Sequence, residues 1–309
     1  MQIELTEFYA RLGTIALILI LGFLLGKWKL ISTNTNKELT NLLLTVFMPA
    51  SLFMAFPATY DEASLNLFFA GLVAGIFIML ILIVLSKILF NKQWFKGGLR
   101  YESQFAFIFN NATFLGYPII ANTFGPTGVI VYCGFIIAFN VALFSYGIWL
   151  FKHEITLKLV KSVVTNPNII AVLAGMMLFL AGWHLPSFVT DAVGFVGGAT
   201  TPLSIICIGF MLSRANFKAI LIKWRLIIVA LSQLILGPLI TFFFLSFLKF
   251  PSEAISVCTL IQALPTATSL GLFATKYSGN NIEASELVTV STILSVVTMP
   301  LMIFLLLSL

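Results

Sequence analysis

Long apolar runs dominate this sequence and limit how the chain can fold. An apolar run of about 20 residues crosses the roughly 30 Å hydrocarbon core of a bilayer as one α-helix. The runs lack the alternation of polar and apolar residues that marks the strands of a membrane β-barrel. The sequence therefore predicts an all-α polytopic membrane protein with ten transmembrane helices. We number these as spans 1 to 10, and they cover roughly 8–26, 38–57, 65–90, 101–123, 127–151, 168–183, 191–213, 225–248, 254–277 and 285–308.

Charged residues are too few to cover a water-soluble protein. They make up 9% of the 309 residues, whereas a soluble domain has about 25%. This excludes a soluble enzyme and a disordered chain, and the lack of a basic stripe excludes a nucleic-acid partner. The spans hold no paired acids and no activated nucleophile, so we predict that the protein is not an enzyme and has no cofactor. No metal site is expected, because the cysteines lie in different spans without metal-ligand spacing.

The Lys and Arg residues fall almost entirely on one side of the predicted membrane. If the connection after span 1 is cytoplasmic, all 17 except Arg11 and Lys249 lie on the cytoplasmic side. Cytoplasmic loops of membrane proteins are enriched in these two residue types. The partition therefore supports ten spans independently of hydropathy. It predicts a protein of the cell membrane, inner or plasma, with both termini outside the cytoplasm.

Similar features recur after about half the chain. Gly26 closes span 1 and Gly182 closes span 6, an offset of 156 residues, while Pro49 and Pro202 interrupt spans 2 and 7 at an offset of 153. Span n therefore corresponds to span n+5. Because five is odd, the two halves have opposite orientations in the membrane. We predict a single membrane transport domain over 1–309, with one repeat over about 1–152 and an inverted one over about 160–309. Such repeats are typical of secondary transporters.

Span 4 carries polar and helix-breaking residues near its middle. Asn110 and Asn111 are paired amides that need partners inside a membrane. Gly116 lets another backbone approach closely, and Pro118 removes a helical hydrogen bond and frees a carbonyl. A helix broken here exposes N–H groups at the positive end of its second half, which suits a carboxylate.

Span 9 carries the same kind of interruption. Here Pro265 is followed by three hydroxyl residues, Thr266, Thr268 and Ser269. If spans 4 and 9 cross, two half-helix N-termini face one cavity, which predicts a substrate site. The alternative is that the amides and hydroxyls only join helices. The candidate substrate-binding residues are Asn110, Asn111, Gly116, Pro118, Pro265, Thr266, Thr268 and Ser269.

These two motifs resemble those of a known family. The pattern Asn-x4-Gly-x-Pro at Asn111–Pro118 is similar to the fourth span of the auxin efflux carrier family. Ala263-Leu264-Pro265, with Phe273 and Tyr277 after it, is similar to the ninth span. That family includes bacterial malate and malonate permeases and the plant PIN-formed carriers, and it belongs with the bile acid transporters in one superfamily. The resemblance extends over the whole chain in length, span number and topology.

The resemblance implies an architecture and an activity. Spans 1, 2, 6 and 7 would form a scaffold that makes a homodimer, and spans 3–5 and 8–10 a transport part. The family moves organic anions by an elevator-like alternating-access motion. By the matching motif, Asn111 would bind the substrate carboxylate and Pro118 would mark the crossover. Leu270 replaces a second proline of the plant carriers, and the long loop of those carriers is absent, so a small carboxylate such as malate or malonate is a better substrate than auxin.

Ionisable groups that could couple transport to an ion gradient are scarce. We expect Glu102, Glu253, Glu283 and Glu286 to be solvated charges at the membrane interface, because they lie near predicted span ends. Coupling to sodium, coupling to protons and uniport therefore all stay open.

Polar residues inside other spans are further candidates for ion or substrate contacts. The bile acid symporters use a glutamate in span 9 as a sodium ligand, where this chain has the uncharged Gln262. Asn140 in span 5 and Gln233 in span 8 are polar candidates, or else packing contacts. The alternative function is a sodium-coupled organic anion symporter closer to the bile acid carriers.

Two glycine pairs allow close helix packing. Gly22 and Gly26 lie one turn apart in span 1, and Gly71 and Gly75 in span 3. Small residues at this spacing let helix backbones approach. We expect packing within the chain ahead of a dimer contact.

Overall fold

The described part of the computed structural model is helical throughout. It comprises residues 5–56, 61–91, 98–154, 161, 163–214, 223–278 and 282–307, and these contain no named strand. The predicted connection between spans 5 and 6 lies partly outside these residues. In chain order the helices are α1 (Leu5–Lys27), α2 (Thr33–Leu42), η1 (Leu43–Phe47), α3 (Met48–Phe53), α4 (Glu62–Leu89), α5 (Gly98–Ile108), η2 (Ala112–Gly116), α6 (Tyr117–Ala142), η3 (Leu143–Gly147), α7 (Ile148–Lys152), α9 (Pro167–Ala181), α10 (Ser187–Gly198), α11 (Thr200–Ser213), α13 (Trp224–Leu231), η4 (Ser232–Leu236), α14 (Gly237–Phe247), α15 (Ser252–Gln262), α16 (Ser269–Phe273), η5 (Ala274–Ser278) and α17 (Ile282–Leu307).

Several of these helices are long and apolar enough to cross a membrane. The described residues contain five such stretches, together with two shorter apolar helices, Gly13–Lys27 and Pro167–Ala181. The all-helical, multi-pass prediction is therefore confirmed, while the count of ten stays a prediction. The five stretches are Glu62–Leu89, Ala112–Lys152, Ser187–Ser213, Trp224–Phe247 and Glu283–Met302.

A kink separates the segments predicted as spans 4 and 5. The stretch Ala112–Lys152 is helical on both sides of Gly125, which has a φ of 62° and a ψ of −154°. Glycine adopts this positive φ without the clash that a Cβ would cause. Pro126 follows and cannot continue the hydrogen-bonding pattern. The chain therefore turns at the place where the sequence predicts a short connection.

Prolines explain three of the wide helical turns. The π-helical segments η1, η2 and η4 each end two residues before a proline, namely Pro49, Pro118 and Pro238. A proline in a helix leaves the carbonyl one turn earlier without its usual N–H partner. In a wider, π-helical turn the carbonyl can accept from the N–H five residues later instead of four. The related interruption by Pro202 lies just after Ala199, where α10 ends and α11 begins.

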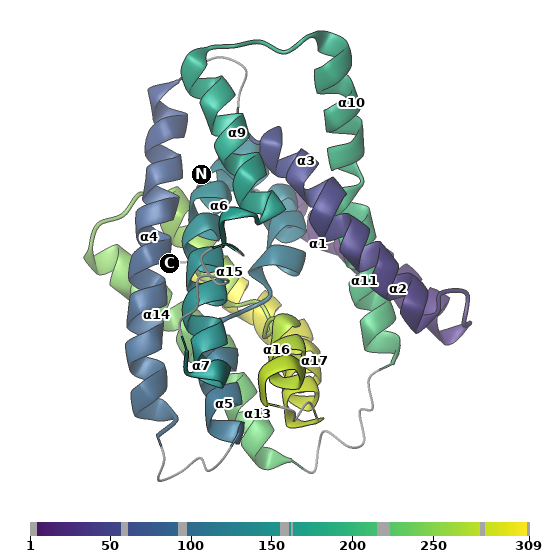
Figure 1. Cartoon of the computed structure of the whole chain (residues 1–309), viewed down its shortest axis with the longest axis vertical. Helices are drawn as coiled ribbons and strands as arrows, with labels where there is room; N and C mark the ends of the chain where they lie inside the picture. Colours follow the sequence, from purple (N-terminus) through teal and green to yellow (C-terminus); the bar gives the residue numbers. More distant parts are fainter. Residues whose placement is uncertain are drawn as a thin grey trace.

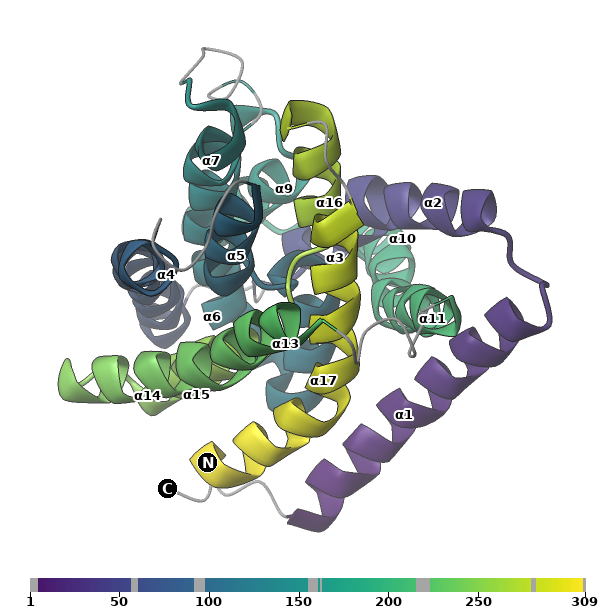
Figure 2. The same cartoon turned by 90° about the horizontal axis from the view of Figure 1, so that it is seen from below.

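The two glycine pairs pack helices together within the chain, as expected. A Cβ on Gly22 of α1 would lie 2.3 Å from the carbonyl oxygen of Ile206 in α11. A Cβ on Gly71 of α4 would lie 2.1 Å from the carbonyl oxygen of Val131 in α6. These backbones can touch only because both positions are glycine. Figures 1 and 2 show α1 beside α11 and α4 beside α6.

The core is centred on α5 and the helices around it. Phe105, Phe107 and Phe109 are fully buried, and the Phe105 ring packs on those of Phe109 and Phe273. Viewed from below, α5 and α7 lie on one side of the molecule, α1, α2 and α11 on the other, and α17 between them (Figure 2). The packed phenylalanines hold the end of α5 in place, and the chain loses its helical form directly after it.

Candidate functional site

Two helix breaks meet in the interior of the protein. The chain is non-helical at 109–111, after α5, and at 263–268, between α15 and α16. The two segments run antiparallel, and Asn110 is bridged to Thr266. The Asn111 N–H donates to the Pro265 carbonyl at 2.7 Å, and the Ala267 N–H donates to the Phe109 carbonyl at 2.9 Å. Each break therefore satisfies backbone groups of the other, which a buried non-helical segment requires. We call residues 109–111 and 263–268 the crossover.

The crossover brings together positions that correspond in the two proposed repeats. The bridged residues Asn110 and Thr266 are 156 positions apart, the same offset that relates Gly26 to Gly182. Helix pairs correspond in the same way, because α1 packs on α11 and α3 packs on α9. Helices α1 and α11 belong to spans 1 and 7, and α9 and α3 belong to spans 6 and 2. Exchanging each span n with span n+5 therefore converts the first pair into the second. The inverted repeat itself stays a prediction.

Two buried amides join the broken helices. The Asn110 Nδ2 donates to Gln262 Oε1 at 2.8 Å, and both side chains are 1% exposed. This contact links the break at 109–111 to Gln262, the last residue of α15 before the break at 263–268. It leaves Asn110 Oδ1 and Gln262 Nε2 buried with no hydrogen-bond partner in the described part of the chain. An unpartnered amide N–H group is a donor available to an anion.

Further polar groups fix the second break. Gln233 Nε2 donates to the Leu264 carbonyl at 2.5 Å, and Gln233 Oε1 accepts from Thr266 Oγ1 at 3.4 Å. The Thr266 N–H donates to Ser291 Oγ of α17 at 3.0 Å. Sequence reasoning missed Ser291, because a serine one or two turns from other hydroxyls in a long apolar helix carries no distinguishing pattern. The second break is thus held from two neighbouring segments, η4 and α17.

Asn111 and Ser269 lie at the crossover with groups that are not engaged. Asn111 is 7% exposed and caps η2, and within the described residues its side-chain amide forms no hydrogen bond. The Ser269 hydroxyl is buried without a partner, and Thr268 precedes α16 without a side-chain capping bond. The structure thus brings Asn110, Asn111, Pro265 and Thr266 into direct contact and places Thr268 and Ser269 at the edge of the same break.

Three predicted residues have a different role from the one expected. A Cβ on Gly116 would meet the ring of Tyr132 at 3.1 Å, so this glycine accommodates a side chain and not a neighbouring backbone. Pro118 lies at the start of α6, and the helix is broken before it, at 109–111. Asn140 Nδ2 donates to the Ile136 carbonyl of its own helix at 2.9 Å and does not join the crossover contacts.

The residue that replaces the second proline of the plant carriers is helical. Leu270 is fully buried in the five-residue helix α16, next to the second break. A leucine continues a helix that a proline would interrupt. The break at 263–268 therefore ends at α16 in this chain.

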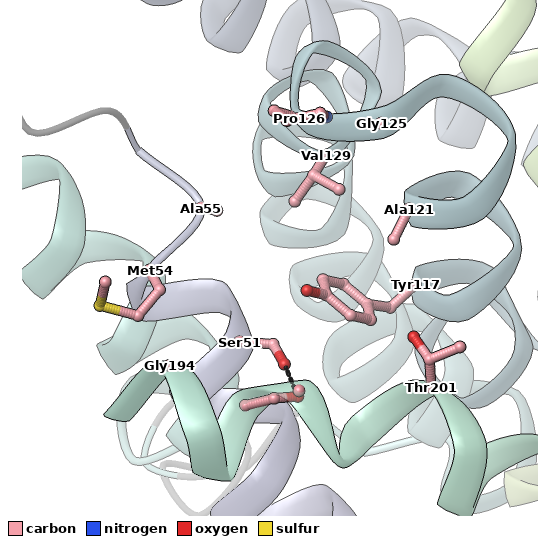
Figure 3. Close-up of a pocket in the computed structure, with 12 residues that line it drawn as sticks. Ser51, Met54, Ala55, Tyr117, Ala121, Gly125, Pro126, Val129, Gly194 and Thr201 are labelled. Carbon is pink, nitrogen blue, oxygen red and sulfur yellow. Dashed lines mark hydrogen bonds between the residues drawn. The ribbon is translucent and has the colours of Figure 1, made fainter. Parts of the chain in front are cut away.

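A cavity of about 350 Å³ lies between α3, α10, the start of α11 and α6 (Figure 3). The Tyr117 ring projects into it, and the Thr201 hydroxyl points toward that ring. Ser51 Oγ donates to the Gly197 carbonyl at 2.6 Å. The described residues that line the cavity carry no charge. They are Ser51, Met54, Ala55, Tyr117, Ala121, Gly125, Pro126, Val129, Gly194, Gly197, Gly198 and Thr201.

The cavity was not predicted, because its lining comes from three distant parts of the chain. Tyr117 directly follows Gly116 and η2, so the cavity reaches the helix that begins at the crossover. Ser51 comes from span 2 and Gly197 from span 7, which form part of the proposed scaffold. The opening therefore lies where the proposed scaffold meets the proposed transport part.

One of the four glutamates expected at the interface is buried instead. Glu102 is 1% exposed, and both its carboxylate oxygens lack a hydrogen-bond partner. Glu253 and Glu283 are partly exposed, and Glu286 accepts from Lys223. The expectation that Glu102 is solvated was wrong, because a position near a span end does not show how many helices surround that end. Here α5 is enclosed by its neighbours from Glu102 onward.

Comparisons with known proteins agree with this architecture. A family described as membrane transport protein matches residues 8–156 and 151–303. The chain is 24% identical to the uncharacterized transporter MJ1031 of Methanocaldococcus jannaschii, over 85% of this chain and 87% of the relative. It is 27% identical to an uncharacterized transporter of Methanothermobacter thermautotrophicus, over 62% and 63%. It is 23% identical to the uncharacterized transporter YfdV of Escherichia coli, over 97% and 98%.

The two family matches together cover nearly the whole chain and include both breaks. The motifs at Asn111–Pro118 and Ala263–Pro265 lie inside them. The relatives point to a role in transport and not in catalysis. The chain therefore belongs to the membrane transport protein family, the auxin efflux carrier family that its two motifs resemble.

Proposed function

We propose that this membrane transporter moves small organic anions, carboxylates such as malate or malonate, and holds them at the crossover. The observation that carries the proposal is the pair of crossed breaks with unengaged amide groups. Gln262 Nε2 is a buried donor without a partner, and Asn111 has an amide free of hydrogen bonds to described residues. A carboxylate accepts several hydrogen bonds, so it satisfies such donors.

The positive ends of the half-helices add to this preference. The first N–H groups of the helical segment that starts at Ala112 have no helical acceptor before them, as in every helix. Asn111 stands directly at this end. A negative group placed there gains from both the N–H donors and the local dipole. The site therefore binds an anion with amides and backbone groups in place of a cationic side chain.

The arrangement of helices favours alternating access by an elevator-like motion. In this proposal the scaffold, formed by spans 1, 2, 6 and 7, comprises α1, α2, η1, α3, α9, α10 and α11, and the remaining helices move against it. The cavity beside Tyr117 and Ser51 lies along the boundary between the two groups. A boundary lined by small and uncharged residues, including Gly194, Gly197 and Gly198, can slide without breaking ion pairs. We place a homodimer contact on the scaffold, with both termini outside the cytoplasm and ten spans in two inverted repeats.

The test is uptake of radiolabelled malate and malonate by purified protein in liposomes. Asn111→Ala is expected to lower uptake about tenfold or more, because a hydrogen bond to a charged group contributes about 1.5–3 kcal/mol. Asn140→Ala is the matched control, since Asn140 is also a buried amide but bonds to its own helix. Wild-type uptake by Asn111→Ala would remove Asn111 from the site, and no uptake of either anion by the unmodified protein would refute the substrate class.

A sodium-coupled symporter is the second candidate function. Asn110 Oδ1 is a buried oxygen without a hydrogen-bond partner at the crossover, and amide oxygens are ligands for hard cations. Replacing sodium by choline in the same liposome assay separates the two functions. Uptake that needs sodium supports the symporter, and equal uptake in choline refutes it.

A further inference from the structure

Glu102 is an acidic side chain in the protein interior, and none of the described residues neutralises it. The residue is 1% exposed, and neither carboxylate oxygen has a hydrogen-bond partner. Every residue from Glu102 to Ala112 is buried, so this segment has no contact with bulk water. A charge in such a place is costly unless it is paired, and inside membrane proteins unpaired acids are rare. The crossover contacts do not explain it.

The described helices that pack against α5 supply no counter-charge to Glu102. They are α4, α7, α13, η4, α16 and α17, and of these η4 and α16 carry no ionisable side chain. Glu283 of α17 is an acid whose charge acts on Glu102. The other charged groups interact elsewhere: Lys87 lies over the Tyr146 ring, Lys152 pairs with Glu154, Arg225 lies over the Trp224 ring, and Lys223 pairs with Glu286. The remaining acid, Glu62, is exposed at the start of α4.

The ionisable groups beside Glu102 on its own segment also face other partners. Arg100 Nε donates to the Phe90 carbonyl at 3.3 Å, and its guanidinium lies 5.4 Å from the Tyr101 ring centre. The Tyr101 ring in turn packs on His153. A second buried neighbour, Gln104, donates to the same Phe90 carbonyl at 3.0 Å. Among the described residues, none of these groups pairs with the Glu102 carboxylate.

The position of Glu102 connects it to the proposed anion site. Helix α5 runs from Gly98 to Ile108 and leads directly into the break at 109–111. Ile108, the last residue of α5, follows Glu102 by six residues, about 9 Å along a helix at 1.5 Å per residue, and Asn110 comes two residues later. The acid and the amide are therefore carried on one short segment, and a movement of the transport part moves both.

We propose that Glu102 is the proton-binding group that couples anion transport to a proton gradient, an inference that rests on the proposed function. A proton from water on one side of the membrane binds a carboxylate oxygen of Glu102, and the neutral acid moves with the transport part. The same O–H bond breaks when the group meets water on the other side. No bond of the substrate changes, and each transport cycle carries one proton together with the anion.

The experiment compares proton-driven accumulation with simple exchange in liposomes. The malate dianion and one proton together carry a net negative charge, so the membrane potential is clamped at zero with potassium and valinomycin. The unmodified protein is then expected to accumulate malate when a pH gradient is imposed, about tenfold for each pH unit at one proton per cycle. Glu102→Gln keeps the size of the side chain and removes the titrating group. It is expected to exchange labelled for unlabelled malate but to lose the accumulation, and a pH-sensitive dye inside the vesicles should record no malate-dependent proton flux.

Two further variants separate coupling from folding. Glu102→Asp restores a carboxyl group and should recover gradient-driven accumulation. Glu253→Gln removes a partly exposed acid at the start of α15 and should leave accumulation unchanged. Accumulation by Glu102→Gln that equals that of the unmodified protein would overturn the proposal, as would equal loss in Glu253→Gln.

An infrared measurement decides the protonation of Glu102 without any substrate. The difference between spectra of the unmodified protein and Glu102→Gln in detergent should contain the carbonyl stretch of a buried protonated carboxylic acid. A spectrum without this band refutes the proton site even if malate is transported. If the band is present and neither malate nor malonate moves, the proposed substrate class fails while the proton site stands.

Discussion

The contact between Asn110 and Gln262 offers a direct measurement of what holds the crossover together. Both side chains are 1% exposed and share one hydrogen bond of 2.8 Å between Nδ2 and Oε1. Truncating either residue leaves the other amide buried with no partner across the crossover. Such a loss costs about 1–3 kcal/mol. Asn110 Oδ1 and Gln262 Nε2 have no hydrogen-bond partner among the described residues, so the two amides share a single hydrogen bond.

A double-mutant cycle isolates this bond. We expect Asn110→Ala and Gln262→Ala to show a coupling free energy of about 0.6–1.7 kcal/mol, the range for hydrogen bonds between membrane helices. The assay is the free energy of unfolding in mixed micelles for both single variants and the double variant. Asn140→Ala combined with Gln262→Ala is the control, because Asn140 bonds only to its own helix. Coupling below about 0.3 kcal/mol for the first pair, or equal coupling in the control, would show that the amide bond does not hold the crossover.

Two further predictions concern stability away from the crossover. Gly22→Ala should destabilise the protein by about 1–3 kcal/mol in the same unfolding assay, since its Cβ would lie 2.3 Å from the Ile206 oxygen, whereas Gly13→Ala in the same helix meets no atom within 4 Å and should cost nothing. The pKa of Asp61 is held below its usual 3.8 because the carboxylate accepts hydrogen bonds from Ser64 at the start of α4. The ionised Asp61 therefore stabilises the folded protein above about pH 4, and this stability is lost as the pH falls through the lowered pKa. Below about pH 4, the Tm of the unmodified protein should fall more steeply with decreasing pH than the Tm of Asp61→Asn.

The local features of the fold could be predicted because they depend on neighbours in sequence. Hydropathy located the apolar helices, and Gly125 and Pro126 stand where the chain turns between two of them. The residues around Asn110 and Pro265 located both helix breaks within a few positions. Pro118 was less informative, because a proline at the start of a helix shapes the turn before it and does not require a crossover there.

Long-range contacts could not be predicted in the same way. The bond of Gln262 to Asn110 joins residues 152 positions apart, and that of Thr266 to Ser291 joins residues 25 apart. Nothing in the local sequence distinguishes these residues from polar groups such as Asn140, which bonds within its own helix. Which of these amides belong to the candidate site depends on how helices from both halves pack.

The sequence by itself determined that this chain is a helical membrane protein with two interrupted helices, because the length of an apolar run and the chemistry of Pro, Gly and Asn act over a few residues. Only the tertiary structure decided that the two breaks pair with each other, that a cavity opens beside Tyr117, and that Glu102 is buried without a hydrogen-bond partner among the described residues. The physical reason is that burial and partnership are properties of the surroundings. An acid near the end of a span is solvated if that end is open to water and isolated if other helices enclose it.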